Sequence, residues 1–135
     1  MLASGLADLV DNEEDLARFL MSSGHFNAAG AKAAAFLPNP KDGETSVYRH
    51  GSHPPASLWQ IASDHVRATR NLHGAAIVKA KHVRSVLLDV VAHEPPPRHA
   101  NIVNWPSSHA DPDMTKAEQK ERAALIAQHA EMVRR

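Results

Sequence analysis

The sequence predicts an α+β fold, in which a small, mainly antiparallel sheet carries two or three helices packed on one face. Three observations lead to this prediction. Strand-like runs come as two pairs, a helical pattern lies between the pairs, and another helical pattern closes the chain. The strands and helices do not alternate regularly, so the sequence gives no indication of a parallel sheet. The chain of 135 residues can bury a core of its own, so residues 1–135 are expected to form a single domain.

The N-terminal region is expected to contain a loose end and a short helix. Residues 1–10 carry little pattern and should be frayed or loosely helical. Asp11 then offers a helix cap, and Leu16, Phe19 and Leu20 follow at the three- and four-residue spacing that is typical of a helix. A Ser-Ser-Gly sequence would end this helix.

The next two elements are expected to be strands. The apolar run at residues 31–37 ends at a Pro-Asn-Pro sequence; its alanines could also form a helix, but we interpret it as a strand. Thr45–Arg49 follows with β-branched and aromatic residues, which favour a strand. The loop between them is rich in proline and glycine, so the two strands would form a hairpin.

The middle of the chain predicts a helix followed by a second pair of strands. Apolar side chains recur on one face of residues 58–69, which indicates an amphipathic helix. His65 lies on that face, where a hydrogen-bonded core histidine is more common than a catalyst. Residues 75–80 and 86–92 are rich in Val, Ile and Leu and are interpreted as strands, joined by a turn or a single helical turn at residues 81–85.

A stiff, polar segment at residues 95–106 separates these strands from the last helix. It begins with three prolines, and it contains Arg98, His99 and Asn101 and one of the two tryptophans. A capping-box pattern beginning at Thr115 then predicts a C-terminal helix over residues 114–134.

The composition excludes several classes of protein. The chain has no cysteine, so it has no disulfide and no thiolate metal site. Its 15 basic and 15 acidic residues balance, which disfavours a nucleic-acid partner because dedicated DNA-binding proteins normally carry a basic excess. No signal peptide or membrane-spanning apolar run is apparent, so we expect a cytoplasmic protein without a membrane partner. Ten histidines make the chain histidine-rich.

The strongest candidate site combines Arg49, Arg98, His99 and Asn101. Guanidinium, imidazole and carboxamide groups together can bind a phosphate or a carboxylate. If the sheet brings Arg49 beside the other three, they form one anion-binding site. The alternative is that these side chains satisfy backbone groups around an irregular loop.

A metal site and a cofactor are not expected. His50 and His53 have a His-x-x-His spacing, and His93 and His99 could add ligands for zinc. No further metal-binding motif supports this weak alternative. Trp59 and Trp105 are interpreted as core or interface anchors. The basic residues that could follow a phosphate backbone are better explained as a solvated face; they are Arg67, Arg70, Lys79, Lys81 and Arg84.

Three segments occur in one order: Ala35-Phe36-Leu37-Pro38, Glu44-Thr45-Ser46-Val47-Tyr48-Arg49, and Arg98-His99-Ala100-Asn101-Ile102 with Trp105-Pro106. In that order they resemble a family of small bacterial proteins of uncharacterised function, over about residues 17–130. The resemblance implies a bacterial cytoplasmic origin and points to the same four site residues. It implies no activity, cofactor or partner. The His53-Pro54-Pro55 sequence departs from the ordinary helix start expected for the family, which puts the His50 and His53 pair in doubt.

Three functions remain open from the sequence, and a non-enzymatic one is favoured. The first is a small binding module that recognises an anionic group, on a ligand, a nucleic acid or a protein partner, through the cluster of Arg and His residues. The second is a hydrolase or transferase acting on a nucleotide or phosphoester, with His99 as the acid or base. The third is an assembly protein that docks on a partner through its alanine-rich C-terminal helix; a homo-oligomer is one version of this function.

Overall fold

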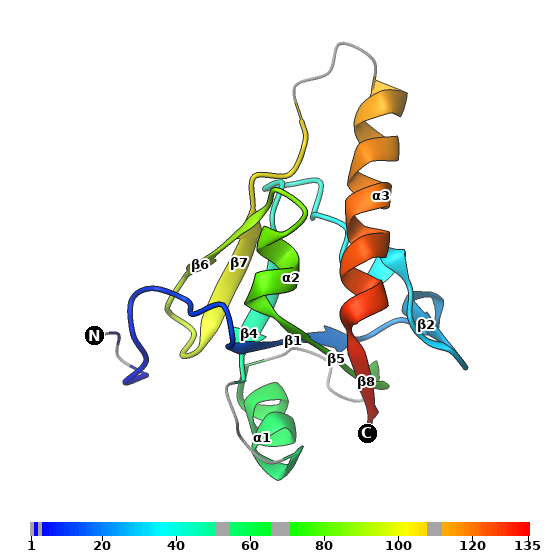
Figure 1. The fold of residues 1–135 in the computed structure, drawn as a ribbon. Helices are drawn as coiled ribbons and strands as arrows, with labels where there is room; N and C mark the ends of the chain where they lie inside the picture. The colour runs from blue at the N-terminus through cyan, green and yellow to red at the C-terminus, as the bar shows by residue number, and fades with distance from the viewer. Residues whose placement is uncertain (1, 3, 51–54, 66–70, 108–111) are drawn as a thin grey trace.

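A six-stranded antiparallel sheet lies at the centre of the computed structural model, which describes residues 2, 4–50, 55–65, 71–107 and 112–135. The strand order is β6-β7-β4-β1-β5-β8 (Figure 1). The strands are β1 (Asp15–Leu20), β4 (Thr45–Arg49), β5 (Gly74–Lys79), β6 (Asp89–Ala92), β7 (His99–Val103) and β8 (Glu131–Arg134). A small separate hairpin pairs β2 (Phe26–Asn27) with β3 (Gly30–Ala31). The predicted α+β class with a mainly antiparallel sheet is confirmed.

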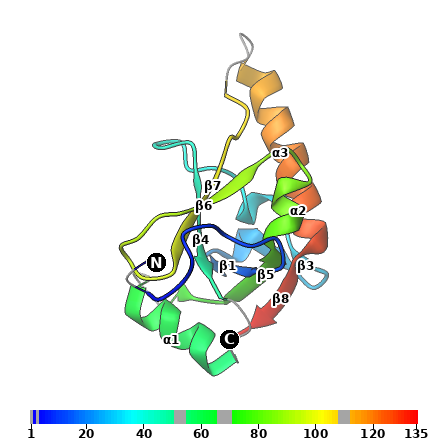
Figure 2. The same cartoon turned by 60° about the vertical axis from the view of Figure 1, so that its left-hand side comes forward.

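Helices cover both faces of this sheet. The described helices are α1 (Pro55–His65), α2 (Ala80–Arg84) and α3 (Pro112–His129), with single 3₁₀ turns η1 (Ser23–His25) and η2 (Ala33–Ala35). Two helices, α2 and α3, share one face, whereas α1 lies on the other face (Figures 1 and 2). The larger core, under α2 and α3, includes Val47 and Ile126, and the smaller core, under α1, includes Tyr48 and Leu58.

The helix expected around Leu16 is wrong, because residues 15–20 form β1. This strand is buried on both faces: Leu16 and Leu20 belong to the larger core, and Ala17 and Phe19 to the smaller one. A central strand buried on both sides has no simple alternation of apolar and polar residues. In β1, Leu16, Phe19 and Leu20 therefore show the three- and four-residue spacing that is typical of a helix.

The expected strand at residues 31–37 and its hairpin with Thr45–Arg49 are also wrong. Residues 33–35 form the 3₁₀ turn η2, in agreement with the low strand propensity of alanine. The strand β4 is present as predicted, but it pairs with β1 and β7, with Ala17 opposite Tyr48 and Val47 opposite Ala100. Burial of both faces of β4 between two neighbours outweighs the local hairpin signal.

Most elements of the middle region are confirmed. The helix α1 overlaps the predicted helix, β5 matches residues 75–80 closely, and β6 begins later than residue 86. A single helical turn, α2, joins β5 to the loop before β6. The side chain of His65 and the proposed cap at residue 52 lie outside the residues whose placement the structure describes.

Besides β1, two more strands of the six-stranded sheet were not expected. The polar segment at residues 95–106 contains β7, and the predicted helix over residues 114–134 ends at His129, after which residues 131–134 form β8. Pairing with β5, in which Ala75 faces Val133, overrides the helical preference of these last residues.

The N-terminal segment that was expected to be frayed packs against the domain. The backbone N–H and the hydroxyl of Ser4 donate to the carboxylate of Glu94, at 3.2 and 2.5 Å. The carbonyl of Ala7 accepts a hydrogen bond from Arg49, and Val10 is buried in the larger core. These contacts order a segment whose sequence alone gives no structural signal.

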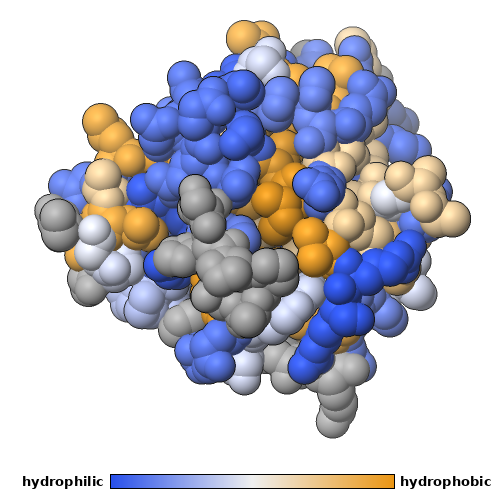
Figure 3. Space-filling view, turned by 60° about the horizontal axis from the view of Figure 1, so that its bottom comes forward, coloured by the Kyte–Doolittle hydropathy of each residue, from blue (hydrophilic) through white to orange (hydrophobic). Residues whose placement is uncertain are grey.

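In the view of Figure 3 hydrophilic residues cover much of the surface, and hydrophobic residues form smaller areas between them. In the part of the chain that the structure describes, no helix combines the length and the apolar character needed to cross a bilayer.

Candidate functional site

Arg49 is a buried structural anchor rather than an exposed cation. Its side chain is only 1% exposed, and its guanidinium forms an ion pair with the carboxylate of Glu14. The same guanidinium donates to the carbonyl of Ala7 at 2.7 Å and, more weakly, to that of Leu9 at 3.4 Å. The hydrogen bond to Glu14 raises the pKa of Arg49 above its usual value, while burial acts in the opposite direction.

Arg98 lies directly beside the backbone of Arg49. The backbone N–H of Arg49 donates to the carbonyl of Arg98 at 2.7 Å, and the Arg98 Nη1 group donates to the carbonyl of Arg49 at 3.1 Å. Arg98 has a left-handed φ of 70°, and its backbone N–H donates to the carboxylate of Glu94 at 3.1 Å. The structure therefore brings the two arginine segments together, but largely through backbone hydrogen bonds.

The four predicted site residues are divided between the two faces of the sheet. Arg49 lies opposite Leu16 and shares its face, which is the face of α2 and α3. His99 lies opposite Tyr48, and Asn101 lies opposite Ser46, both on the face of α1. The side chain of Asn101 is 7% exposed. The guanidinium of Arg49 and the imidazole of His99 thus do not face a common opening.

His99 forms a hydrogen-bonded arrangement with Ser46 and His93. The Oγ atom of Ser46 lies 2.6 Å from the Nε2 atom of His99, and the Nδ1 atom of His99 lies 2.8 Å from the backbone carbonyl of His93. A carbonyl oxygen only accepts hydrogen bonds, so Nδ1 carries the proton. In the neutral imidazole, Nε2 is then unprotonated and can accept the hydroxyl hydrogen of Ser46.

The strand register explains why these groups meet. Ser46 and Tyr48 alternate along β4 and project to the same face, opposite Asn101 and His99 of β7. Ser46 is therefore a diagonal neighbour of His99, within reach of its ring. His93 follows β6, and its backbone N–H donates to the carbonyl of His99 at 2.9 Å, which holds the His93 carbonyl beside the imidazole. The ring of Tyr48 contacts His99 edge-on, with centroids 5.4 Å apart.

The surroundings keep His99 neutral near pH 7. Partial burial lowers the pKa of His99 below its usual 6.5, and the nearby imidazole of His93 acts in the same direction. The hydrogen bond to the His93 carbonyl and the charge of Glu44 oppose this shift. A neutral imidazole with a free Nε2 lone pair can act as a general base.

A cavity of about 360 Å³ adjoins Ser46 at the end of the sheet where β4 begins. Its walls come from β1, from η1 and from the loop before β4; the polar residues among them are Arg18, His25, Asn39, Asp42, Glu44 and Ser46. The guanidinium of Arg18 donates from Nε to the carbonyl of Ala35 at 2.8 Å and from Nη1 to the carbonyl of Ser46 at 2.9 Å. The cavity therefore places a cation and two carboxylates beside Ser46, whose backbone carbonyl binds Arg18.

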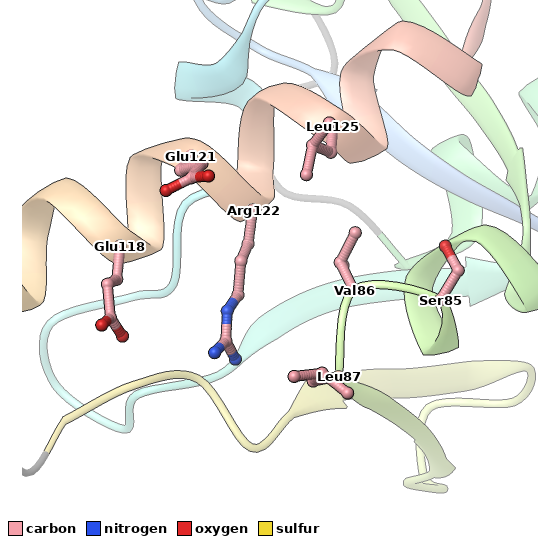
Figure 4. Close-up of a pocket in the computed structure, with 7 residues that line it drawn as sticks. All are labelled: Ser85, Val86, Leu87, Glu118, Glu121, Arg122 and Leu125. Atoms are coloured by element: carbon pink, nitrogen blue, oxygen red, sulfur yellow. The ribbon is translucent and has the colours of Figure 1, made fainter.

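A second hollow, of about 320 Å³, lies between α3 and the loop that follows α2 (Figure 4). Leu87, 77% exposed, and Leu125, 39% exposed, give it apolar walls. Its Ser85 hydroxyl donates to the carbonyl of His82 at 2.7 Å, so no base activates this serine. This hollow lacks the paired hydroxyl and imidazole found at Ser46.

The other candidates from the sequence have ordinary explanations where they are described. Trp105 is buried in the larger core, and Trp59 packs against the smaller one. The basic residues Lys81 and Arg84 form ion pairs with Glu13 and Asp89, whereas positions 67 and 70 lie outside the described residues.

The weak metal alternative finds no cluster in the described chain. His50 is 8% exposed, and its proposed partner, His53, lies outside the described residues. Among the residues described, no group of three or more His, Asp or Glu side chains could hold a metal ion.

Sequence reasoning singled out His99 but missed Ser46, His93 and Arg18. Ser46 and Tyr48 alternate in a predicted strand, so their common face was predictable. The pairing of β4 with β7 was not, because it joins residues 53 positions apart. No family model, curated protein or solved structure matches the chain. The resemblance to a family of small bacterial proteins stays a prediction.

Proposed function

We propose that the protein is a hydrolase or transferase acting on a nucleotide or another phosphoester, with Ser46 as nucleophile and His99 as acid and base. The observation that supports this most is the 2.6 Å contact between Ser46 Oγ and the unprotonated Nε2 of His99. A serine hydroxyl is a weak nucleophile until an adjacent base accepts its proton. The carbonyl of His93 holds the imidazole in the tautomer that this reaction needs.

The proposed reaction is balanced in two steps. Ser46 Oγ attacks the phosphorus atom while its proton passes to His99 Nε2, and the leaving oxygen departs with that proton. His99 then deprotonates a water, and the resulting hydroxide attacks the phosphorus atom of the phosphoserine. The P–O bond to Ser46 breaks, and His99 returns the proton to the Ser46 oxygen. In a transferase, an acceptor hydroxyl takes the place of the water.

This reading is favoured over a purely binding module built on Arg49 and Arg98. That module needs both guanidinium groups to be available for an anion. The ion pair with Glu14 occupies Arg49, and its 1% exposure leaves no room for a ligand. The sequence leads us to expect a cytoplasmic protein, so we propose that the reaction takes place in the cytoplasm.

A fluorophosphonate probe tests the proposal without knowledge of the substrate. We expect the probe to lose fluoride and to phosphonylate Ser46, because His99 activates this hydroxyl. Peptide mass spectrometry locates the label. Ser46→Ala should abolish it, and His99→Ala should slow it by about 10²-fold or more, a typical contribution of a general base.

Ser22 is the internal control, since it is an exposed serine whose hydroxyl oxygen accepts a hydrogen bond from the backbone N–H of Gly24 at the start of η1. Labelling of Ser46 no faster than labelling of Ser22 contradicts the proposal. Equal rates in the wild-type protein and His99→Ala, with unchanged melting temperatures, contradict it as well.

The pH dependence of labelling gives a second prediction. The rate should rise with pH as His99 loses its proton, and its midpoint should lie below pH 6.5 because the pKa of His99 is lowered. His93→Ala removes an imidazole that lowers this pKa but keeps the carbonyl that orients His99. The midpoint should therefore move to higher pH in this variant. A midpoint above 6.5 in the wild-type protein rules out His99 as the base in the described environment.

A further inference from the structure

The side chain of Arg18 occupies a gap between two strands. The strand β1 pairs with β4 only through Leu16 and Ala17, so the two strands separate at Arg18. The partly buried side chain lies across this gap, where the carbonyls of Ala35 and Ser46 fix two of its donors. The orientation of the guanidinium is thus set by backbone atoms of two neighbouring elements.

Arg18 has no counter-ion in the described part of the chain. Its two hydrogen-bond acceptors are neutral carbonyls, no described carboxylate forms an ion pair with it, and its Nη2 group has no hydrogen-bond partner there. Burial lowers the pKa of Arg18, which reflects the cost of holding this charge away from water. Buried charges in proteins are normally paired. An anion bound in the cavity would supply the counter-ion that this oriented guanidinium lacks.

The cavity beside Arg18 is large enough for a small anion. Its volume of about 360 Å³ lies at the lower end of the range for ligand sites. His25 from η1 supplies a second nitrogen base, and its pKa is lowered by burial and by the charge of Arg18. The two carboxylates of the lining come from the loop before β4, and that of Asp42 accepts a hydrogen bond from the backbone of Glu44 at 2.9 Å.

We infer that this cavity binds a phosphate group, held by the Arg18 guanidinium with His25 as a second donor. A planar guanidinium matches the oxygens of a tetrahedral oxyanion and forms charge-assisted hydrogen bonds with them. Arg18 also bonds the carbonyl of Ser46, which lines the same cavity. Arg18 shares the face of Leu16 and Leu20, whereas the hydroxyl of Ser46 lies with His99 on the face of α1. The inference therefore goes beyond the proposed function: the cavity is a phosphate site of its own beside the backbone of Ser46.

Equilibrium binding of inorganic phosphate and sulfate, followed by isothermal titration calorimetry, tests the site without catalysis. We expect saturable binding that weakens by about tenfold or more in Arg18→Gln, as one charge-assisted contact is lost. Lys116→Gln, which removes one exposed positive charge from α3, should bind like the wild type. Binding that is absent, or that weakens equally in both variants, overturns the inference.

Two further variants keep the test decisive if Arg18→Gln folds poorly. Ala34 is an exposed residue in the cavity wall, and Ala34→Trp should block binding while leaving Arg18 in place. Ser46→Ala removes the proposed nucleophile and should bind phosphate normally. Normal binding by Ala34→Trp places the anion elsewhere and contradicts the inference. Acetate binding as tightly as phosphate contradicts the assignment to a phosphate group.

The protonation of His25 provides an independent readout. A bound sulfate should offset the charge of Arg18 that lowers the pKa of His25, so this pKa should rise when sulfate is added. The charged groups facing His25 across the cavity are Arg18, Asp42 and Glu44. Proton NMR titration with and without sulfate measures the shift, and His25→Gln identifies the signal. An unchanged pKa contradicts the site. Labelling at Ser46 without phosphate binding separates failure of this inference from failure of the proposed function.

Discussion

Replacing Arg49 by leucine is expected to destabilise the fold by about 3–5 kcal/mol, the cost of removing one partner of a buried ion pair. The substitution leaves the Glu14 carboxylate, 15% exposed, without its cation. It also removes the hydrogen bond to the carbonyl of Ala7, which holds the N-terminal segment against the sheet. Urea unfolding followed by circular dichroism measures the change in the free energy of unfolding.

An exposed ion pair from the same region is the matched control. Lys81 and Glu13 lie 3.1 Å apart, with side chains 45% and 64% exposed. Lys81→Leu should therefore change the stability by less than about 1 kcal/mol. If Arg49→Leu costs no more than Lys81→Leu, Arg49 is not a structural anchor, and its role in anion binding has to be considered again.

Gly74→Ala is expected to detach β8 from the edge of the sheet. A Cβ atom at this position would lie 2.5 Å from the carbonyl oxygen of Val133 and 3.1 Å from the Cα atom of Arg134. These are backbone atoms of the partner strand, so β8 has to move away as a whole. Glycine in a strand often marks such a close approach of two backbones. Overpacking of this kind typically costs about 1–3 kcal/mol.

Hydrogen exchange measured by mass spectrometry locates the damage. Amides of residues 131–134 should exchange faster in Gly74→Ala, while those of the central strand β4 should change much less. Gly24→Ala is the control, because the nearest atom to its new Cβ, the Oγ of Ser22, lies at an ordinary 3.6 Å. Unchanged protection of β8 in Gly74→Ala would show that the two strands are not as close as described.

The sequence predicted correctly the elements whose own residues strongly favour a strand or a helix. The β-branched residues of β4 and the apolar face of α1 were recognisable without tertiary information. The strand β1 was mistaken for a helix because it is buried on both faces. The strand β8 was hidden because its four residues have little strand preference of their own and depend on the edge of β5.

In the candidate site too, some residues could be recognised from the local sequence, and others only from contacts between distant segments. His99 was recognised from its chemistry and from its polar surroundings. Its partner Ser46 was not, because only the pairing of β4 with β7 makes them neighbours. Arg49 was misjudged for a related reason: a sequence does not distinguish an exposed arginine from one paired with Glu14, 35 positions away.

The strand order also has a consequence for the chain as it is synthesised. Among the residues that the structure describes, one long edge of β5, with the sequence Gly-Ala-Ala-Ile-Val-Lys, pairs only with residues 131–134. Until those residues have left the ribosome, the nascent protein exposes an apolar strand edge to other chains. Exposed edges of this kind are templates for aggregation. Conditions that slow translation of the last helix should therefore lower the soluble yield more than the stability of the finished protein would suggest.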